Sequence, residues 1–272
     1  MNTTVYWKTS CSIDMWTAFT NRVRKAFTEA ADQYDILTSL HKEIGRELVK
    51  KTMRLPAERI LDVGCGTGYT TNKTKFFFPE SAVVGMDIAE GMLARAAGMH
   101  EGIAIDWVQA DAQTLPFKDS SFDLVLSNLA YQWVKDLDAA FAQAHRVLAD
   151  KGVLNITLFG ERTCEELFSS LKAFHPDLDL KHLPTVEKVR AALGQAGFKD
   201  IRVDYELIKV EFKDLRELLG WLKNIGANSI PTDKVFLGKQ MLANVDTHYR
   251  EHFPYNEGIC ASFEVIWAYA QK

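Results

Sequence analysis

The chain has 272 residues, of which 47% are hydrophobic and 25% are charged. This balance is typical of a globular protein with a sizeable core. The formal net charge of −4 argues against generic nucleic-acid binding, which usually needs a strongly basic face. No apolar run reaches the roughly 18 residues of a membrane helix, and the chain does not start like a secretion signal. We therefore expect neither a nucleic-acid partner nor a membrane span.

The four cysteines are scattered along the chain, at Cys11, Cys65, Cys164 and Cys260. No two of them form a C-x-x-C pair, and no histidine cluster has metal-ligand spacing. We therefore expect no structural disulfide and no metal site, and we expect a cytoplasmic protein.

Short apolar strands alternate with helices from residue 59 to residue 159. The predicted strands are 59–64, 82–87, 103–109, 122–127 and 152–159, and the predicted helices are 69–77, 90–97 and 138–148. This alternation indicates an α/β fold with a mostly parallel, doubly wound sheet.

After Gly160 the regular alternation of short apolar strands and helices ends. Helices are predicted over 165–174, 186–197 and 215–225, strands over 201–212 and 260–270, and a mixed pattern over 228–258. The sheet does not need these helices, so we interpret them as a cap over its ligand-binding edge. The predicted divisions are an N-terminal extension (1–19), N-terminal helices with the α/β core (20–160), cap helices interleaved with core strand 201–212 (161–258), and a final core strand (259–272).

The most informative motif follows the first predicted strand, where residues 61–68 read L-D-V-G-C-G-T-G. Glycines in such a turn let the backbone approach a bound ligand, and the next helix starts with free amide donors. A dinucleotide-binding fingerprint would have its third glycine where this chain has Tyr69. A nicotinamide-dependent dehydrogenase is therefore improbable.

Two more carboxylates lie at predicted strand ends, at Asp87 and Asp111. Asp87 is suited to accept both hydroxyls of a ribose, and the paired glycine turn favours this role over the alternative of a helix N-cap. Asp111 is suited to accept from an adenine amino group while the backbone amide of Ala112 meets a ring nitrogen. Ile88 and Met92 would either sandwich the adenine or belong to the core.

Together these segments resemble motifs I to III of class I S-adenosylmethionine methyltransferases, over roughly residues 55–160. The resemblance implies a Rossmann-like fold: a seven-stranded, mostly parallel sheet with helices on both faces and a helical cap. It also implies S-adenosyl-L-methionine as cofactor, S-adenosyl-L-homocysteine as product, and no metal. If the roles of the matching family residues apply here, Asp87 would hold the ribose and Asp111 would hold the adenine. The residues expected around the methionine end are Asp62, Gly64, Gly66 and Gly68.

The stretch 128–133, N-L-A-Y-Q-W, resembles the malonyl-acyl-carrier-protein O-methyltransferase family of biotin synthesis. It differs from the N-P-P-Y pattern of amino methyltransferases. Further segments that fit this family are 23–27 with 30–35, 141–148, the L-K-x-I-G-A signature at 222–228, and 256–259 with 266–269. The resemblance begins near residue 20, and residues 1–19 look like an extension outside it.

This resemblance implies methyl transfer to the free carboxylate of a malonyl thioester, carried by acyl carrier protein or coenzyme A. The product is the methyl ester that primes pimeloyl synthesis for biotin. Gln132 and Asn128 would orient cofactor or substrate, and Lys223 or Arg24 would select a carboxylate unless they are merely solvated. Rigid walls, or alternatively core positions, are expected from Tyr34, Tyr131 and Trp133.

Several alternatives remain open at this point. One is a methyltransferase for another small molecule, such as a quinone precursor or a free dicarboxylic acid. Another is a catalytically inactive subunit that binds the cofactor and serves a partner. An acidic carrier protein needs a basic docking face, and either 22–25 or 50–54 would supply one, although solvated helix faces give the same pattern.

Overall fold

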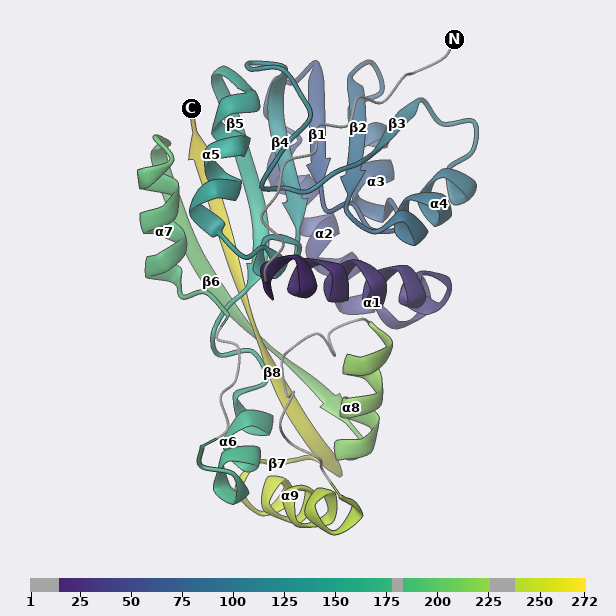
Figure 1. Ribbon diagram of the computed structural model, residues 1–272, viewed down its shortest axis with the longest axis vertical. Helices are drawn as coiled ribbons and strands as arrows, with labels where there is room; N and C mark the ends of the chain where they lie inside the picture. Colours follow the sequence, from purple (N-terminus) through teal and green to yellow (C-terminus); the bar gives the residue numbers. More distant parts are fainter. Residues whose placement is uncertain (1–14, 178–182, 226–237) are drawn as a thin grey trace.

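A computed structural model describes residues 15–177, 183–225 and 238–272 of the chain. Its centre is a sheet in the order β3-β2-β1-β4-β5-β8-β6, with the two-residue β7 paired to β8 (Figure 1). The strands are β1 Arg59–Val63, β2 Ala82–Asp87, β3 Ile105–Gln109, β4 Phe122–Asn128, β5 Leu148–Phe159, β6 Lys199–Phe212, β7 Pro254–Tyr255 and β8 Gly258–Gln271.

The first five strands of this order pair in parallel, whereas β8 is antiparallel to both β5 and β6. The strand order reverses between β1 and β4, which is where open α/β sheets bind their ligands. The predicted Rossmann-like sheet of seven strands, mostly parallel, is confirmed, and β7 is a short addition to it.

The helices agree with the predicted alternation over most of the chain. The spacing of Leu37, Leu40, Ile44 and Leu48 predicts an amphipathic helix before the first strand, and α2 is that helix. The bounds of α1 were not predicted, and α9 lies in the stretch that showed only a mixed pattern. The helices are α1 Met15–Leu37, α2 Ser39–Thr52, α3 Tyr69–Phe77, α4 Glu90–Met99, the 3-10 helix η1 Tyr131–Trp133, α5 Leu137–Val147, α6 Glu165–Phe174, α7 Val186–Gln195, α8 Leu215–Asn224 and α9 Lys239–His252.

Alternate side chains of the central strands bury against helices on opposite faces. Leu61 of β1 packs into a cluster with Phe141 of α5 and Leu193 of α7. Its neighbour Ile60 packs into a second cluster with Leu48 of α2. Because successive side chains of a strand point to opposite faces, burial on both sides explains why these strands are continuously apolar.

The cap is built on the two longest strands. β6 and β8 have 14 residues each, and they extend beyond the parallel strands to carry α6, α8 and α9 (Figure 1). A separate apolar cluster, which includes Leu167, Leu218 and Tyr249 from these helices, packs on β8 residues such as Phe263. The cap is therefore continuous with the sheet through hydrogen-bonded strands. The prediction that the helix over 186–197 belongs to the cap is wrong, because α7 buries Val189 and Leu193 in the core cluster beside α5.

Helix α1 lies across the molecule between the sheet and the cap (Figure 1). It contacts α4 of the core and α8 of the cap. The proposed boundary of an N-terminal extension at residue 19 falls inside this helix, and residues 1–14 lie outside the described part of the chain. Within the described ranges, no helix is long and apolar enough to cross a membrane.

The turn after β1 passes very close to the loop after β4. The Gly64 backbone has φ +72°, and a Cβ built there would lie 2.2 Å from the Ala130 Cβ. Both the left-handed conformation and the close approach therefore require glycine at this position.

We expect Gly64→Ala to lower the free energy of unfolding by about 2–4 kcal/mol, because the added methyl group combines backbone strain with overpacking. Denaturant unfolding followed by circular dichroism measures this change. Gly98→Ala is the matched control, because Gly98 is exposed on α4 and an added Cβ there would have no other atom within 4 Å. If Gly64→Ala lowers the free energy of unfolding no more than Gly98→Ala changes it, the steric argument is contradicted.

Candidate active site

Asp87 at the end of β2 connects the glycine turn to the start of α4. Its Oδ2 accepts from the Gly66 amide at 2.9 Å, and its Oδ1 accepts from the Ala89 amide at 2.8 Å. Burial nevertheless raises the pKa of this carboxyl, while the bonds from Ala89 and Gly66 lower it. Asp87 therefore stabilises the local backbone, and it also lines a cavity.

This first cavity brings together the carboxylates predicted at the second and third strand ends. Asp111 follows β3, and its Oδ1 accepts from the Gln113 amide at 2.8 Å. Met92 is buried, whereas Ile88 is partly exposed. The predicted residues that line the first cavity are Tyr34, Gly64, Gly66, Asp87, Ile88, Met92, Asp111, Ala112, Asn128, Tyr131 and Trp133.

A second cavity lies over the glycine turn. Its lining includes Gly64, Gly66 and Asp62 from the turn and Asp35, His41 and Lys42 from the α1–α2 corner. Gly68, the last glycine of the motif, is not part of the lining of any of the three cavities described here. It occupies the N-cap position of α3, where φ is +82°.

Asp62 has one carboxyl oxygen that is not used within the described structure. Its Oδ2 accepts from the Thr71 hydroxyl at 2.6 Å, but its buried Oδ1 has no hydrogen-bond partner among the described residues. Burial raises the pKa of Asp62 to about 7, with a smaller lowering by Thr71 and a smaller raising by Asp87. A buried, unpartnered carboxyl oxygen is suited to a cationic or N–H-bearing ligand group.

The α1–α2 corner covers the second cavity through an ion pair. Lys42 Nζ lies 3.1 Å from Asp35 Oδ1, and this same oxygen accepts from the Thr67 hydroxyl at 3.0 Å. Asp35 Oδ2 is buried and, within the described structure, has no hydrogen-bond partner. The corner thus holds the turn and presents a second unused carboxylate oxygen.

A third cavity lies between the core and the cap, and its walls are mainly aromatic. Phe159 and Phe263 come from β5 and β8, Leu222 comes from α8, and Phe27 and Trp133 line both this cavity and the first. The Phe27 and Trp133 rings meet edge to face, 5.5 Å apart. The described residues of this lining include no Lys, Arg, Asp or Glu.

Tyr34 lines all three cavities. Burial raises the pKa of its phenol, and the carboxylates of Asp87 and Asp35 raise it further, so Tyr34 is neutral at physiological pH. The three spaces therefore converge on one rigid, uncharged aromatic side chain.

Asn128 and Gln132 have clear structural contacts at the end of β4. Asn128 Nδ2 donates to the His41 carbonyl at 3.0 Å, and its Oδ1 accepts from the Thr157 hydroxyl at 2.8 Å. Gln132 Nε2 donates to the Leu129 carbonyl at 2.7 Å and lines the third cavity. Their predicted orienting role stays a prediction.

Tyr131 is almost fully buried, and its hydroxyl has no hydrogen-bond partner among the described residues. Its ring packs 5.1 Å from that of Phe141 in α5 and also lines the first cavity. Burial raises the pKa of this phenol. Both earlier interpretations, a cavity wall and a core residue, therefore describe Tyr131.

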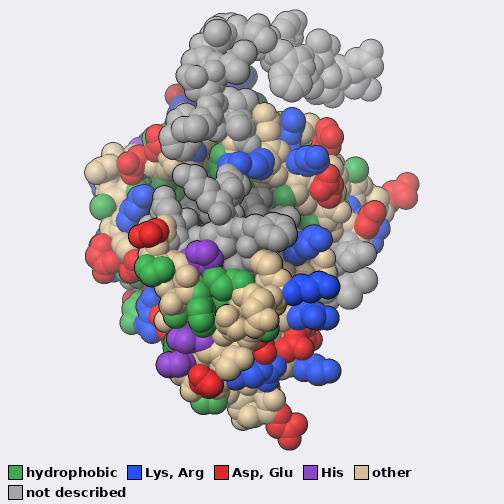
Figure 2. Space-filling view, turned by 60° about the horizontal axis from the view of Figure 1, so that its bottom comes forward, with side chains coloured by type: hydrophobic (Ala, Val, Ile, Leu, Met, Phe, Trp, Pro, Cys, Tyr) green, Lys and Arg blue, Asp and Glu red, His purple; other side chains and the backbone are tan. Residues whose placement is uncertain are grey.

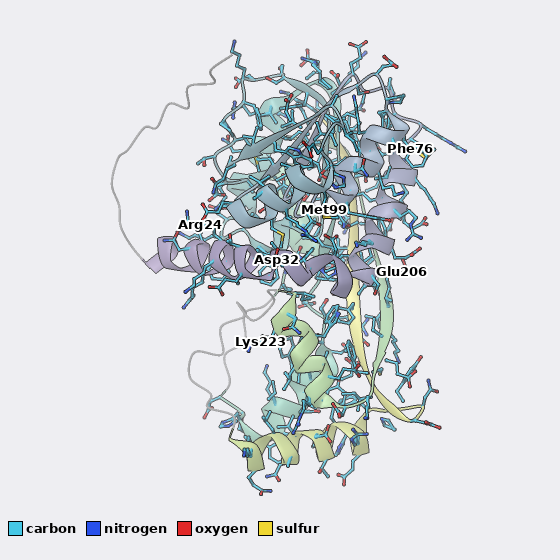
Figure 3. The ribbon with its side chains drawn as sticks, turned by 90° about the vertical axis from the view of Figure 1, so that its right-hand side faces the viewer. Arg24, Asp32, Phe76, Met99, Glu206 and Lys223 are labelled. Atoms are coloured by element: carbon cyan, nitrogen blue, oxygen red, sulfur yellow. The ribbon has the colours of Figure 1, made fainter. Side chains whose placement is uncertain are left out.

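The two predicted cations lie on the outer surface. Lys223 on α8 and Arg24 on α1 are exposed, and neither lines the three cavities. Figure 3 shows Lys223 at the end of α8 that lies nearest to α1, the helix that carries Arg24. Only part of the predicted 222–228 signature can be placed, because residues 226–228 lie outside the described ranges.

Our sequence reasoning did not select His41, Lys42 or Asp35 as site residues. The amphipathic pattern before the first strand predicts a helix, and this pattern indicates only which face is buried. Asp35 near the end of α1 accepts from Thr67 of the glycine turn. The His41 carbonyl accepts from Asn128 at the end of β4, so both contacts depend on the tertiary packing of α1 and α2. No local signal identifies these three side chains as neighbours of the site.

The residues present fit the methionine end and the nucleoside of S-adenosyl-L-methionine. The orphaned oxygens of Asp62 and Asp35 suit an ammonium group, and at Gly66 an added Cβ would have only the Tyr34 ring within 4 Å, so this glycine leaves space for a ligand. Asp87 and Asp111 offer carboxylates along the adjoining cavity. No group of three His, Cys, Asp or Glu side chains suited to a metal ion occurs in the described ranges.

Comparison with known proteins agrees with this geometry. A family profile described as a methyltransferase domain matches residues 61–156. The chain is 34% identical to the malonyl-[acyl-carrier protein] O-methyltransferase of Geobacter sulfurreducens, over 92% of this chain and 98% of that protein. It is 33% identical to the protein of that name from Hahella chejuensis, over 90% of this chain and 88% of that protein.

Solved structures share the fold at lower identity. The YcgJ protein of Bacillus subtilis has a TM-score of 0.61 at 18% identity, over 85% of this chain and 98% of its own. Phosphoethanolamine N-methyltransferase 2 of Haemonchus contortus, solved with S-adenosyl-L-methionine, has a TM-score of 0.53 at 22% identity, over 84% of this chain and 52% of its own. With the full-length similarity to the Geobacter protein, the glycine turn and the converging cavities, this chain belongs to the malonyl-[acyl-carrier protein] O-methyltransferase family of S-adenosylmethionine-dependent enzymes.

Proposed function

We propose that this protein transfers a methyl group from S-adenosyl-L-methionine to the free carboxylate of a malonyl thioester. The observation that carries the proposal is the convergence of the three cavities on Tyr34. Two of them contain the predicted cofactor residues, and the third offers a mostly apolar space for an acceptor. The names of the full-length relatives support the choice of acceptor.

In this proposal the first cavity holds the adenosine and the second cavity holds the methionine part. Asp87 accepts from the ribose hydroxyls, and Asp111 with the Ala112 amide recognises the adenine. Asp62 and Asp35 bind the ammonium group through their unused oxygens. When bound, the cofactor supplies an electrophilic methyl group on a sulfonium centre.

The acceptor needs no general base, because a malonyl carboxylate is ionised at neutral pH. Transfer from a sulfonium to a carboxylate neutralises both charges, so a site with little water favours the transition state. The aromatic walls of the third cavity exclude water, and Tyr34 and Trp133 restrict the approach to one direction. Cys164 also lines this cavity, but burial and Glu166 raise the pKa of its thiol to about 12, so it stays protonated.

For a carrier-bound substrate, we propose that α1 provides the docking face. Val23 and Phe27 of α1 point into the first cavity, whereas Arg24 and Lys25 are exposed. Both basic clusters contain paired side chains: Lys25 lies 3.8 Å from Glu29, Lys50 pairs with Glu47, and Lys51 lies over the Trp267 ring at 4.0 Å. The choice of α1 therefore rests on its contact with the cavity. Figure 2 also shows a row of Lys and Arg side chains along the right-hand side of the cap face. An acidic carrier protein would complement such a surface.

Mass spectrometry tests the reaction directly. After incubation with enzyme and S-adenosyl-L-methionine, malonyl-carrier protein is expected to gain the mass of one methylene group, and an esterase should remove it. A reaction without cofactor is the control. No mass gain, together with turnover of a free dicarboxylic acid, would refute the proposed acceptor.

Cofactor binding is expected to release protons at about pH 6, below the pKa of about 7 that burial gives to Asp62 in the free protein. The free carboxyl is then mostly protonated, and a bound ammonium group lowers its pKa, so the proton leaves. Well above pH 7 the carboxyl is already ionised and the release should vanish. Isothermal titration calorimetry in buffers of different ionisation enthalpy counts the protons.

Asp62→Asn should abolish this proton release and weaken cofactor binding. Asp106→Asn is the control, because Asp106 is an exposed carboxylate on β3. A proton release that persists unchanged in Asp62→Asn would show that another group titrates.

Charge reversal on α1 tests the docking face. We expect a variant with glutamate in place of Arg22, Arg24 and Lys25 to have a several-fold higher apparent Michaelis constant for malonyl-carrier protein. Its Michaelis constant for malonyl-CoA should be unchanged. Glutamate at Lys50 and Arg54 is the matched comparison, with a smaller expected effect. Equal effects of the α1 changes on both substrates would contradict docking at α1.

A further inference from the structure

His41 is a polar side chain in a mainly apolar cavity, and the cofactor assignment leaves it unused. It belongs to the first turn of α2 and lines both the second and the third cavities. Its Nδ1 atom is buried and has no hydrogen-bond partner among the described residues. A buried ring nitrogen without a partner costs free energy unless a ligand satisfies it.

The imidazole is held in place by its backbone and by aromatic rings. Asn128 at the end of β4 donates to the His41 carbonyl oxygen at 3.0 Å, which fixes the start of α2 against the sheet. The ring of Phe159 lies edge-on with centroids 5.6 Å apart, and that of Tyr34 lies 6.0 Å away. The position of the imidazole is therefore set by the sheet and by the walls of the third cavity.

The hydrogen-bond donors of Thr163 and Gln132 in the third cavity already have partners, and the buried Gln132 Oε1 is an acceptor that cannot bind a carboxylate. The Thr163 hydroxyl accepts from the Glu264 amide at 3.1 Å, and Gln132 Nε2 donates to the Leu129 carbonyl at 2.7 Å. Burial lowers the pKa of His41 to about 4, so its ring is neutral at physiological pH. A neutral imidazole carries one N–H donor, and a carboxylate only accepts, so a carboxylate would select the tautomer with the proton on Nδ1.

Building on the function proposed above, we propose that His41 binds the acceptor carboxylate in the third cavity by donating a hydrogen bond from Nδ1. The other carboxylate oxygen is then free to attack the methyl carbon. A hydrogen bond from a neutral donor offsets part of the free-energy cost of desolvating the carboxylate. It forms no ion pair, so the carboxylate oxygen keeps more of its nucleophilicity than it would beside a cation. This role is consistent with the absence of Lys and Arg from the described lining.

The proposal is tested with His41→Leu and His41→Gln in the full-length enzyme. Leucine removes the donor, whereas glutamine restores an N–H group at similar reach. We expect His41→Leu to raise the Michaelis constant for malonyl-carrier protein about tenfold or more, as for a lost hydrogen bond to a charged group. His41→Gln should recover most of this loss.

Two binding measurements separate this role from a purely structural one. Acetyl-carrier protein lacks the free carboxylate, so its inhibition constant should be nearly unchanged in His41→Leu. The dissociation constant of S-adenosyl-L-homocysteine, measured by calorimetry, should also be unchanged. Equal losses for the malonyl and acetyl forms would overturn the proposal in favour of a role in shaping the cavity. Weaker cofactor binding with an unchanged Michaelis constant would instead place the function of His41 in the second cavity, and it would also overturn the proposal.

The wild-type enzyme distinguishes failure of the function from failure of the inference. If it does not methylate malonyl-carrier protein, the proposed function and the role of His41 fail together. If it does and His41→Leu keeps the wild-type Michaelis constant, only the assignment of His41 fails.

Discussion

The amides of Gly64 and Cys65 both donate to the Met86 carbonyl, and the Gly66 amide donates to Asp87. These bonds hold the turn after β1 against the end of β2. Gly64 and Gly66 of this turn line both the first and the second cavity, whose other lining residues come from strand ends and from α1 and α2. A side chain at Gly64 would push the turn into the loop after β4, so the whole site depends on this close approach.

The cap is an extension of the sheet rather than a separate body. β8 pairs with β5 inside the core and with β6 along nearly its whole length, so the same strand supports the core and the cap. Phe263 of β8 and Leu222 of α8 therefore reach the same cavity as Trp133 of the core. The third cavity, which we propose as the acceptor space, thus depends on the long antiparallel strands that connect the core and the cap.

Several polar side chains form hydrogen bonds that hold the local structure and also line a cavity. Asp87 accepts from two amides and still lines the first cavity. Asn128 connects β4 to α2 and β5 while it faces the cofactor cavities. Their hydrogen bonds to the protein already fix the orientation of these side chains before a ligand binds. The unused atoms, such as Asp62 Oδ1, are then the ones available to a ligand.

The sequence by itself determined the α/β alternation, the glycine turn and the carboxylates at strand ends, because each follows from local pattern and chain direction. It also carried the family resemblance, which the full-length relatives confirm. It did not predict α1 at its full length or α9, and it did not single out His41 or Asp35. Whether Lys223 lies in a cavity or on the surface was likewise decided by packing. The surroundings of these residues depend on contacts between elements that are distant in the chain, such as α1 with α8 and α6 with α9, and only the tertiary structure determines those contacts.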